Sequence, residues 1–80
     1  MIRMFHGILV VNNFIGMYDI KFKNGYTLGG LDIGVPFEIL DDRGIWHKTR
    51  LVNCFGNILL LNIGVPVEAV IGRVVRIAVD

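Results

Sequence analysis

The sequence predicts an all-β protein, a small barrel or sandwich of six or seven short antiparallel strands. Three observations support this. Short segments rich in β-branched and aromatic residues recur at a spacing of roughly 8 to 12 residues. Gly, Asn and Asp separate these segments, and these residues favour turns. No segment long enough for a stable helix keeps a helical period. One short helical turn is expected near residues 65–70.

The N-terminal part contains the first two predicted strands. Residues Met1–His6 show little pattern, whereas the β-branched run Gly7–Asn12 is typical of a strand covered on both faces. Met17–Phe22 alternates apolar and polar residues, with Asp19 and Lys21 on the polar side, which predicts a half-buried strand.

An Asn-Gly pair follows the second strand. Asn24 and Gly25 both tolerate positive φ, the conformation that a tight hairpin turn requires. We therefore expect Met17–Phe22 to pair with Tyr26–Leu28. Gly29–Val35 is expected to form a loop because it contains three glycines.

A second hairpin is predicted in the centre of the chain. Strands Phe37–Leu40 and Ile45–Val52 flank the turn residues 41–44, which include two aspartates and a glycine. Further strands are predicted at Ile58–Asn62 and Arg73–Val79, and Pro66 favours a first helical turn before the last strand.

The motif I-G-V-P-x-E occurs twice, at Ile33–Glu38 and Ile63–Glu68. Two copies are too few for a solenoid, which needs at least three repeats. Two interpretations stay open: similar turns in which Gly bends the chain and Pro stiffens it, or a duplicated half, which predicts a pseudo-twofold relation between the segments.

The 80 residues predict a single small domain, 1–80, with an unusually apolar composition. On the count that includes glycine but not tyrosine, about 64% of residues are apolar, against a usual 45–50%. A domain of this size buries only roughly 60 to 65% of the surface of its unfolded chain. We therefore expect a protein partner that covers apolar surface, and a homodimer.

Composition also argues against several classes of protein. Apolar runs do not exceed four residues, so we expect no membrane span. The N-terminal residues resemble no signal peptide, so we expect a cytoplasmic location. A lone Cys54 excludes an internal disulfide, and a formal net charge of +1 does not require a polyanionic partner.

The candidate binding residues are Trp46, Lys48 and Arg50, which alternate along one predicted strand face. One interpretation is an exposed platform that grips an acidic partner or stacks on a base. The other is an apolar anchor with the stems of Lys48 and Arg50 lying over it.

No catalytic, metal-binding or cofactor-binding residues are predicted, and we expect no enzyme activity. The chain contains no serine, His47 has no carboxylate at catalytic spacing, and Cys54 is expected to be a small buried side chain. A thiolate pair of Cys54 with His47 is the one nucleophilic alternative. Asp41 and Asp42 are interpreted as solvated turn residues.

Several segments together resemble an uncharacterised family of short proteins from Gram-positive bacteria and their mobile elements. The resemblance covers roughly residues 25–77 and rests on G-x-W-x-x-T-R at Gly44–Arg50 and G-x-x-V-R-I at Gly72–Ile77. An aromatic pair typical of the family is replaced by Asn57–Leu59. The resemblance implies a small SH3-like barrel and no known activity. Its association with mobile elements suggests binding or inhibition of a host factor such as a defence nuclease.

These observations favour a non-enzymatic protein-binding module that associates with itself. The alternative is a nucleic-acid-binding small barrel that uses Trp46, Lys48 and Arg50. Salt separates the two hypotheses, because polyanion binding weakens steeply as salt rises and apolar association does not.

Overall fold

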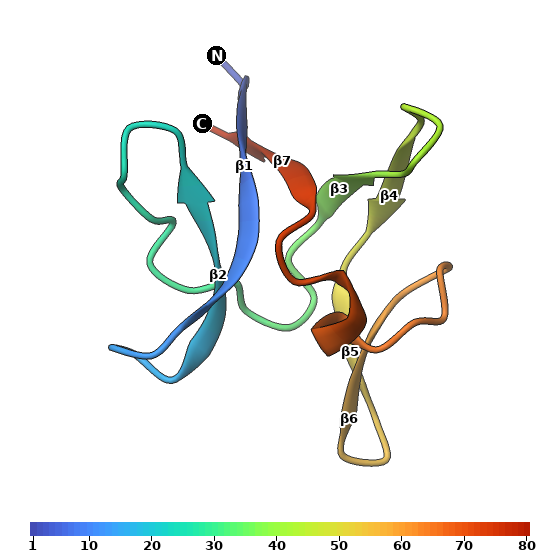
Figure 1. Cartoon of the computed structure of the whole chain (residues 1–80). Coiled ribbons are helices and arrows are strands. Elements are labelled where there is room, and N and C mark those ends of the chain that lie inside the picture. The colour runs from blue at the N-terminus through green and yellow to red at the C-terminus, as the bar shows by residue number, and fades with distance from the viewer.

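The computed structural model describes residues 1–80 and contains seven strands and one 3-10 helix (Figure 1). The strands are β1 (Arg3–Asn12), β2 (Met17–Phe22), β3 (Phe37–Leu40), β4 (Trp46–Thr49), β5 (Leu51–Cys54), β6 (Asn57–Leu60) and β7 (Val74–Val79); the helix, η1, is Val67–Val70. The predicted all-β class and the short helical turn are therefore confirmed.

Five strands form one antiparallel sheet in the order β2-β1-β7-β3-β4, and β5 pairs with β6 in a separate hairpin (Figure 1). Only Arg50 separates β4 from β5, so the chain passes directly from the sheet into the hairpin. The loop after β2 connects β2, at the other edge of the sheet, to the hairpin. In this loop the Leu31 N–H donates to the Tyr18 carbonyl of β2, and the Gly34 N–H donates to the Leu51 carbonyl of β5. No ladder joins β2 to β4, so the sheet is not closed by strand pairing.

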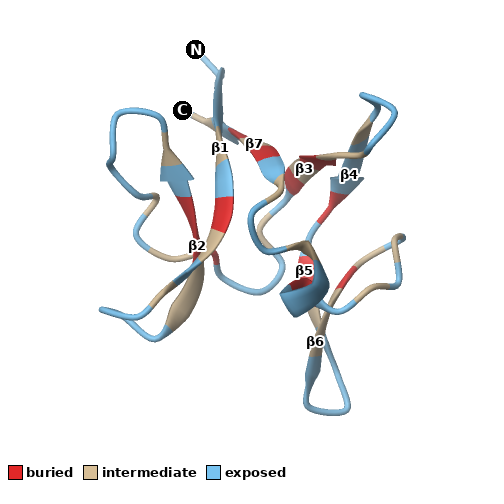
Figure 2. Ribbon diagram, in the orientation of Figure 1, coloured by how far each residue is buried: buried red, intermediate tan, exposed pale blue.

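One hydrophobic core lies between the sheet and the hairpin (Figure 2). It receives alternate side chains of the sheet strands, as expected for sheets covered on one face. Each such burial contributes about 1.5–3 kcal/mol. The buried apolar residues are Leu9, Ile20, Leu31, Phe37, Ile39, Leu51, Leu60, Val67, Val75 and Ile77.

Four predicted strands have other bounds in the structure. Two differ slightly: Ile58–Asn62 is observed as Asn57–Leu60, and Arg73–Val79 as Val74–Val79. The other two differ for a clear reason. The first strand starts at Arg3 rather than Gly7, because residues 3–6 pair with the C-terminal strand β7, as in Arg3↔Val79. The predicted strand Ile45–Val52 is divided at Arg50, because Thr49 pairs with β3 whereas Leu51 pairs with β6.

The predicted pairing after Asn24 and Gly25 is confirmed in direction, although it is too short to count as a strand; the loop contains residues 23–25, and of the pair only Gly25 has positive φ. Lys21 forms a single antiparallel bridge with Thr27. The Phe22 N–H donates to the Tyr26 carbonyl, and the Leu28 N–H donates to the Ile20 carbonyl.

Asp19 on β2, predicted to face solvent, is fully buried. Its carboxylate accepts hydrogen bonds from the Asn12 amide and from the Ile20 N–H, both at 2.8 Å. Burial alone would raise the pKa of Asp19, but these donors, with Gly30 and Thr27, outweigh it and lower the pKa. The buried charge is thus fully hydrogen-bonded.

The two I-G-V-P-x-E segments share a turn and then diverge. Gly34 and Gly64 both have positive φ, at 91° and 75°. The first segment leads into strand β3, whereas the second leads into helix η1. The motif therefore marks two similar bends, in agreement with the first interpretation, and not two equivalent halves.

Only 12 of the 80 residues are buried, and 14 large hydrophobic residues are exposed. This agrees with the composition, which provides more apolar surface than a domain of this size can bury. No helix of the structure has the length and apolar character needed to cross a membrane.

Candidate interaction surface

The side of the five-stranded sheet that faces away from the core is uncovered over β1, β7, β3 and β4, whereas Asp19, on the same side of β2, is buried. Alternate residues of β1, β7, β3 and β4 point to this side, and none of them is buried. We call this surface the outer face; it consists of Met4, His6, Ile8, Glu38, Leu40, Trp46, Lys48, Val74, Arg76 and Ala78. Three of its apolar side chains, Met4, Ile8 and Val74, are each more than 40% exposed.

A row of polar side chains crosses the centre of the outer face in register. His6 is paired with Arg76, Arg76 with Glu38, and Glu38 with Lys48. Arg76 Nε and Nη2 donate to the two carboxylate oxygens of Glu38 at 3.2 and 3.1 Å. This hydrogen bonding by Arg76 holds the pKa of Glu38 below its ordinary value.

Trp46 lies over this row. The guanidinium carbon of Arg76 is 4.1 Å from the centroid of the Trp46 ring. The His6 ring meets the same indole edge-on, with the ring centroids 5.6 Å apart. A cation stacked on a tryptophan at an exposed site contributes about 0.5–1 kcal/mol. Trp46 is therefore a half-buried surface residue held by Arg76 and His6, not a core residue.

The three residues predicted to form the site are only partly brought together. Trp46 and Lys48 share the outer face, whereas Arg50 lies beyond the end of β4, at the junction with β5. Arg76, which neither interpretation of Trp46 included, supplies the cation stacked on its ring. The alternation of residues 73–79 places Arg76 on one strand face, but it does not indicate which strand lies beside it.

The outer edge of β4 has unpaired main-chain groups. The Asp41 N–H donates to the Ile45 carbonyl, so Ile45 directs its main-chain carbonyl toward β3. In an antiparallel pair this direction alternates, so Trp46 and Lys48 direct their N–H and C=O groups away from β3. No other strand pairs with them. Farther along, the Arg50 carbonyl accepts the Leu61 N–H, which covers the edge there.

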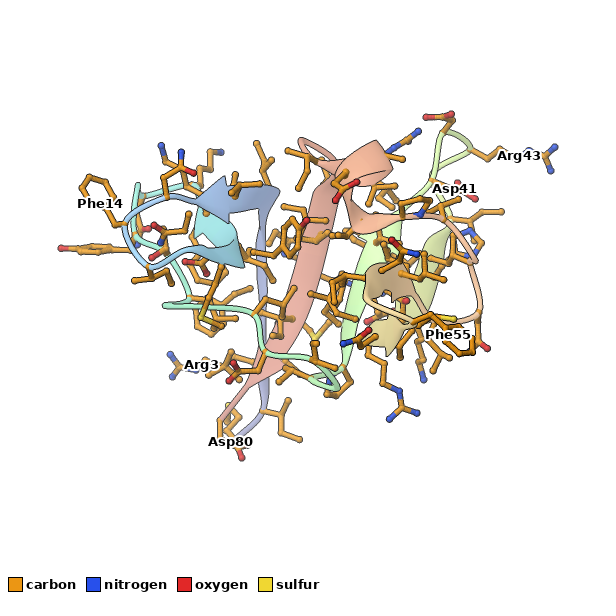
Figure 3. The ribbon with its side chains drawn as sticks, turned by 90° about the horizontal axis from the view of Figure 1, so that it is seen from below. Arg3, Phe14, Asp41, Arg43, Phe55 and Asp80 are labelled. Atoms are coloured by element: carbon orange, nitrogen blue, oxygen red, sulfur yellow. The ribbon has the colours of Figure 1, made fainter.

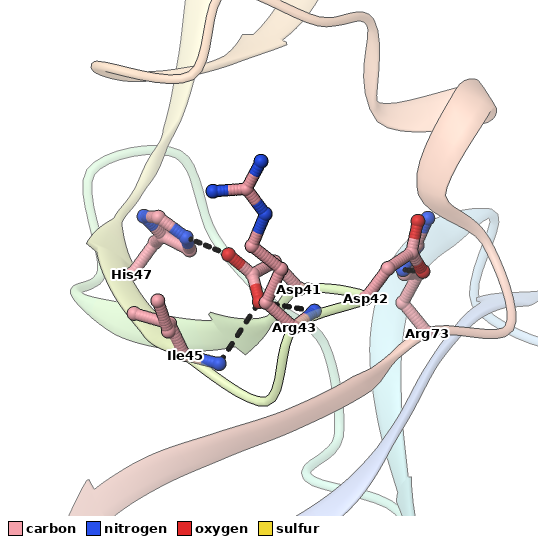
Figure 4. Close-up of polar contacts among 6 residues, drawn as sticks. All are labelled: Asp41, Asp42, Arg43, Ile45, His47 and Arg73. Atoms are coloured by element: carbon pink, nitrogen blue, oxygen red, sulfur yellow. Dashed lines mark hydrogen bonds and ion pairs between the residues drawn. The ribbon is translucent and has the colours of Figure 1, made fainter.

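A second polar group occupies the β3–β4 turn (Figure 4). Asp41 Oδ1 accepts the N–H groups of Arg43 and Ile45 at 2.8 and 2.9 Å, and Asp41 Oδ2 lies 2.7 Å from His47 Nε2. The His47 contact, with these N–H groups, lowers the pKa of Asp41 to about 2. Asp42 pairs with Arg73, which lowers the pKa of Asp42.

The expectation that His47 has no nearby carboxylate is therefore wrong. The sequence contained a signal for this contact: the turn sets Asp41 opposite Ile45, one diagonal step from His47 on the same face. The prediction of two solvated turn residues fits the exposed Asp42 better than Asp41, which is partly buried and bonded to three groups.

Both polar pairs lie on a cleft of about 410 Å³. Apolar side chains contribute half of its lining, among them Ile63, Val65 and Val70. The carboxylates in it are already bonded to donors of this chain: Asp41 to three groups and Asp42 to Arg73. The Asp42–Arg73 pair at this cleft thus holds the β3–β4 turn against the segment that carries Arg73.

Cys54 does not approach the Asp41–His47 pair. It is exposed, contrary to the prediction of a buried thiol, because it is the last residue of β5 beside the turn. Cys54 lines a different recess, which does not include His47. The Thr49 hydroxyl donates to the Leu61 carbonyl at 2.8 Å, so it is committed to a structural bond.

No group of three or more His, Cys, Asp or Glu side chains is arranged to hold a metal ion. Comparisons of the chain with protein-family models, with curated proteins and with solved structures find no match.

Proposed function

We propose that this protein is a non-enzymatic protein-binding module that pairs with a second copy of itself through the open edge of β4. The observation that carries the proposal is the edge itself. Trp46 and Lys48 present unpaired N–H and C=O groups at the border of an uncovered, partly apolar sheet face. Such an edge accepts another extended strand through main-chain hydrogen bonds.

The edge is complementary to its own copy in the antiparallel direction. With His47 at the twofold axis, Trp46 of one copy lies opposite Lys48 of the other, and both residues direct their main-chain groups across the interface. The same pairing sets an indole beside an ammonium group on the outer face, a favourable cross-strand contact. The outer face then continues from one copy into the next.

Arg76 and Glu38 support this surface by fixing Trp46. Because their bonds order the indole in the free chain, less side-chain entropy is lost when a partner covers it. Trp and Arg are also the residues most enriched among the strong contributors to protein interfaces.

The test is analytical ultracentrifugation of wild type and two variants at Lys48. Lys48→Pro removes an N–H that points away from β3, so it leaves the β3–β4 ladder intact. Lys48→Thr keeps the N–H and a β-branched strand residue, and it serves as the matched control. We expect a dimer for wild type and Lys48→Thr and a monomer for Lys48→Pro, with unchanged circular dichroism. A monomeric wild type contradicts self-association.

A nucleic-acid-binding role is the second candidate, because Lys48 and Arg50 are exposed and form no salt bridge. It has less support, since Arg76 already occupies one face of the Trp46 ring that a base would stack on. Titration of single-stranded oligonucleotides at rising salt distinguishes the two. Binding that falls steeply with salt and is lost in a Lys48, Arg50 double variant favours nucleic acid.

A further inference from the structure

A row of apolar side chains crosses the outer face from strand to strand. Ile8 of β1 pairs with Val74 of β7, and Leu40 of β3 pairs with Trp46 of β4. β7 and β3 run side by side in the middle of the sheet (Figure 3), and their register sets Leu40 beside Val74. None of the four side chains is buried. We call them the apolar row: Ile8, Val74, Leu40 and Trp46.

A recess of about 460 Å³ opens beside the middle of the apolar row. It lies where β3 and β7 cease to pair, at the end of β3 that carries Asp41 (Figure 3). Leu40 and Val74 line it, together with Ile71, which is 38% exposed. Its two charged side chains, Asp41 and Arg73, already form ion pairs within the chain. The recess therefore offers an apolar contact to a side chain of another molecule.

A lysine stands at each end of the apolar row once two copies pair through β4. Lys21 of β2 pairs with Ile8 at one end. At the other end, self-pairing sets Lys48 of the second copy opposite Trp46. Both lysines are exposed, and neither forms a salt bridge. The lysine beside Trp46 rests on the proposed function, whereas Lys21 belongs to the row in the single chain.

This side of the sheet has no free carboxylate to balance the two lysines. Glu38 lies opposite Lys48, but Arg76 bonds to both of its oxygens, and Asp19 is buried among its own donors. A second copy packed face to face would therefore add lysines and no free acid. Nucleic acid also fits poorly, because its phosphates recur along a strand, whereas the middle of the row is apolar.

We propose that the apolar row binds a segment of another protein that is apolar in the middle and carries Asp or Glu at both ends. Charge complementarity selects this occupant, since free cations stand only at the two ends of the row. One apolar side chain of the segment enters the recess between Leu40 and Val74, and its neighbours cover Trp46.

The strand spacing sets the length of the segment. Neighbouring strands lie about 4.8 Å apart, so the five spacings from Lys21 to Lys48 of the second copy cover roughly 24 Å. An extended segment of about 7 residues or a helical one of about 16 residues spans this distance.

The probe is a displayed library of random peptides of the longer length, selected on wild type with counter-selection on the row variant, Ile8→Thr with Val74→Thr. Threonine keeps the β-branched shape that suits a strand but reduces the apolar surface of the row. The matched control is Val11→Thr with Ile45→Thr. Val11 and Ile45 are 48% and 53% exposed, against 45% and 41% for Ile8 and Val74, and by alternation they point to the other side of the sheet.

We expect the selected peptides to carry Asp or Glu on both sides of apolar residues. Their affinity falls about tenfold or more in the row variant and is unchanged in the control. Lys21→Gln and Lys48→Thr each weaken binding and reduce its dependence on salt. Trp46 is the only tryptophan of the chain, so a peptide that covers its ring shifts the emission of the protein to shorter wavelength.

Three results of the selection overturn the proposal: no enrichment over the counter-selection, equal affinity for wild type and the row variant, or enrichment of peptides without acidic residues. Binding of a single-stranded oligonucleotide or of phosphatidylserine vesicles that the row variant loses also overturns it, since the occupant is then nucleic acid or lipid. If circular dichroism shows that the row variant does not fold, full affinity in Lys21→Gln overturns it instead.

Self-association is measured separately, by ultracentrifugation. Lys48→Pro removes the dimer but keeps the apolar row and Lys21, so we expect it to bind the peptides with an affinity close to that of Lys48→Thr. A monomeric wild type that binds the peptides contradicts only the β4 edge, and a dimer that does not bind them contradicts only the apolar row.

Discussion

The guanidinium group of Arg76 lies 4.1 Å from the centroid of Trp46 and donates through two nitrogens to Glu38. One side chain thereby links β7, β3 and β4 on the outer face. A partner that covers Trp46 therefore meets an indole that is already fixed, which reduces the entropy lost on binding.

The Arg76–Glu38 pair is expected to be energetically coupled. The Arg76 and Glu38 side chains are 28% and 18% exposed, so solvent screens the pair less than an ordinary surface pair. Arg76→Gln and Glu38→Gln should each lower the free energy of unfolding by about 1–2 kcal/mol, with a coupling of about 1 kcal/mol in the double-mutant cycle. Urea unfolding measures this, and strictly additive effects contradict it.

Asp41 should make the protein sensitive to acid. Its pKa in the folded state is about 2, below the ordinary 3.8, so its stabilising effect is complete above about pH 4 and is lost as pH falls toward 2. Asp41→Asn keeps an acceptor oxygen for the turn but removes the charge. The midpoint of thermal unfolding should fall less steeply with acid in Asp41→Asn than in wild type. Asp32→Asn, at an exposed carboxylate without an ion pair, is the control.

Asp19 should be a strong determinant of stability despite its charge. Asp19→Ala leaves the buried Ile20 N–H and the Asn12 amide without their acceptor, at a cost of about 2–4 kcal/mol in the free energy of unfolding. Asp19→Asn keeps one acceptor oxygen and should cost less. Denaturant unfolding ranks the variants, and Asp19→Ala within about 0.5 kcal/mol of wild type would falsify this role.

Gly7 is required because β1 and β2 approach too closely there for a side chain, not because its backbone needs a positive φ. A Cβ at Gly7 would lie 2.6 Å from the Lys21 carbonyl oxygen and 2.7 Å from Ile20 Cγ2, and the former is a backbone atom that cannot rotate away. Gly7→Ala must push β1 and β2 apart and should destabilise the fold by about 1–3 kcal/mol. Amide hydrogen exchange should speed up first along β2; unchanged protection there argues against the contact.

Local sequence predicts the strands in which alternation and flanking turn residues are both visible in the segment itself. Met17–Phe22 and Phe37–Leu40 have the predicted boundaries because period-two alternation and flanking turn residues define each end. The pairing across the turn at Asn24 and Gly25 is also local, since Phe22 bonds to Tyr26 across residues 23–25 and Gly25 supplies the positive φ that the turn needs.

The boundaries that failed depend on residues far away in the chain. Arg3–His6 has no strand pattern of its own and becomes part of β1 by pairing with β7. Arg50 interrupts a continuous pattern because the chain leaves β3 for β6 at that point. The burial of Asp19 likewise depends on donors from Asn12 and from the segment after Gly25.

Local alternation, turn-forming residues and composition are enough to predict the all-β class, the main turns and the excess of apolar surface. Strand order and register, by contrast, set Arg76 on Trp46, leave the β4 edge open and bury Asp19. The physical reason is that strand order and register set which distant side chains become neighbours, and alternation within one strand carries no information about the strand beside it.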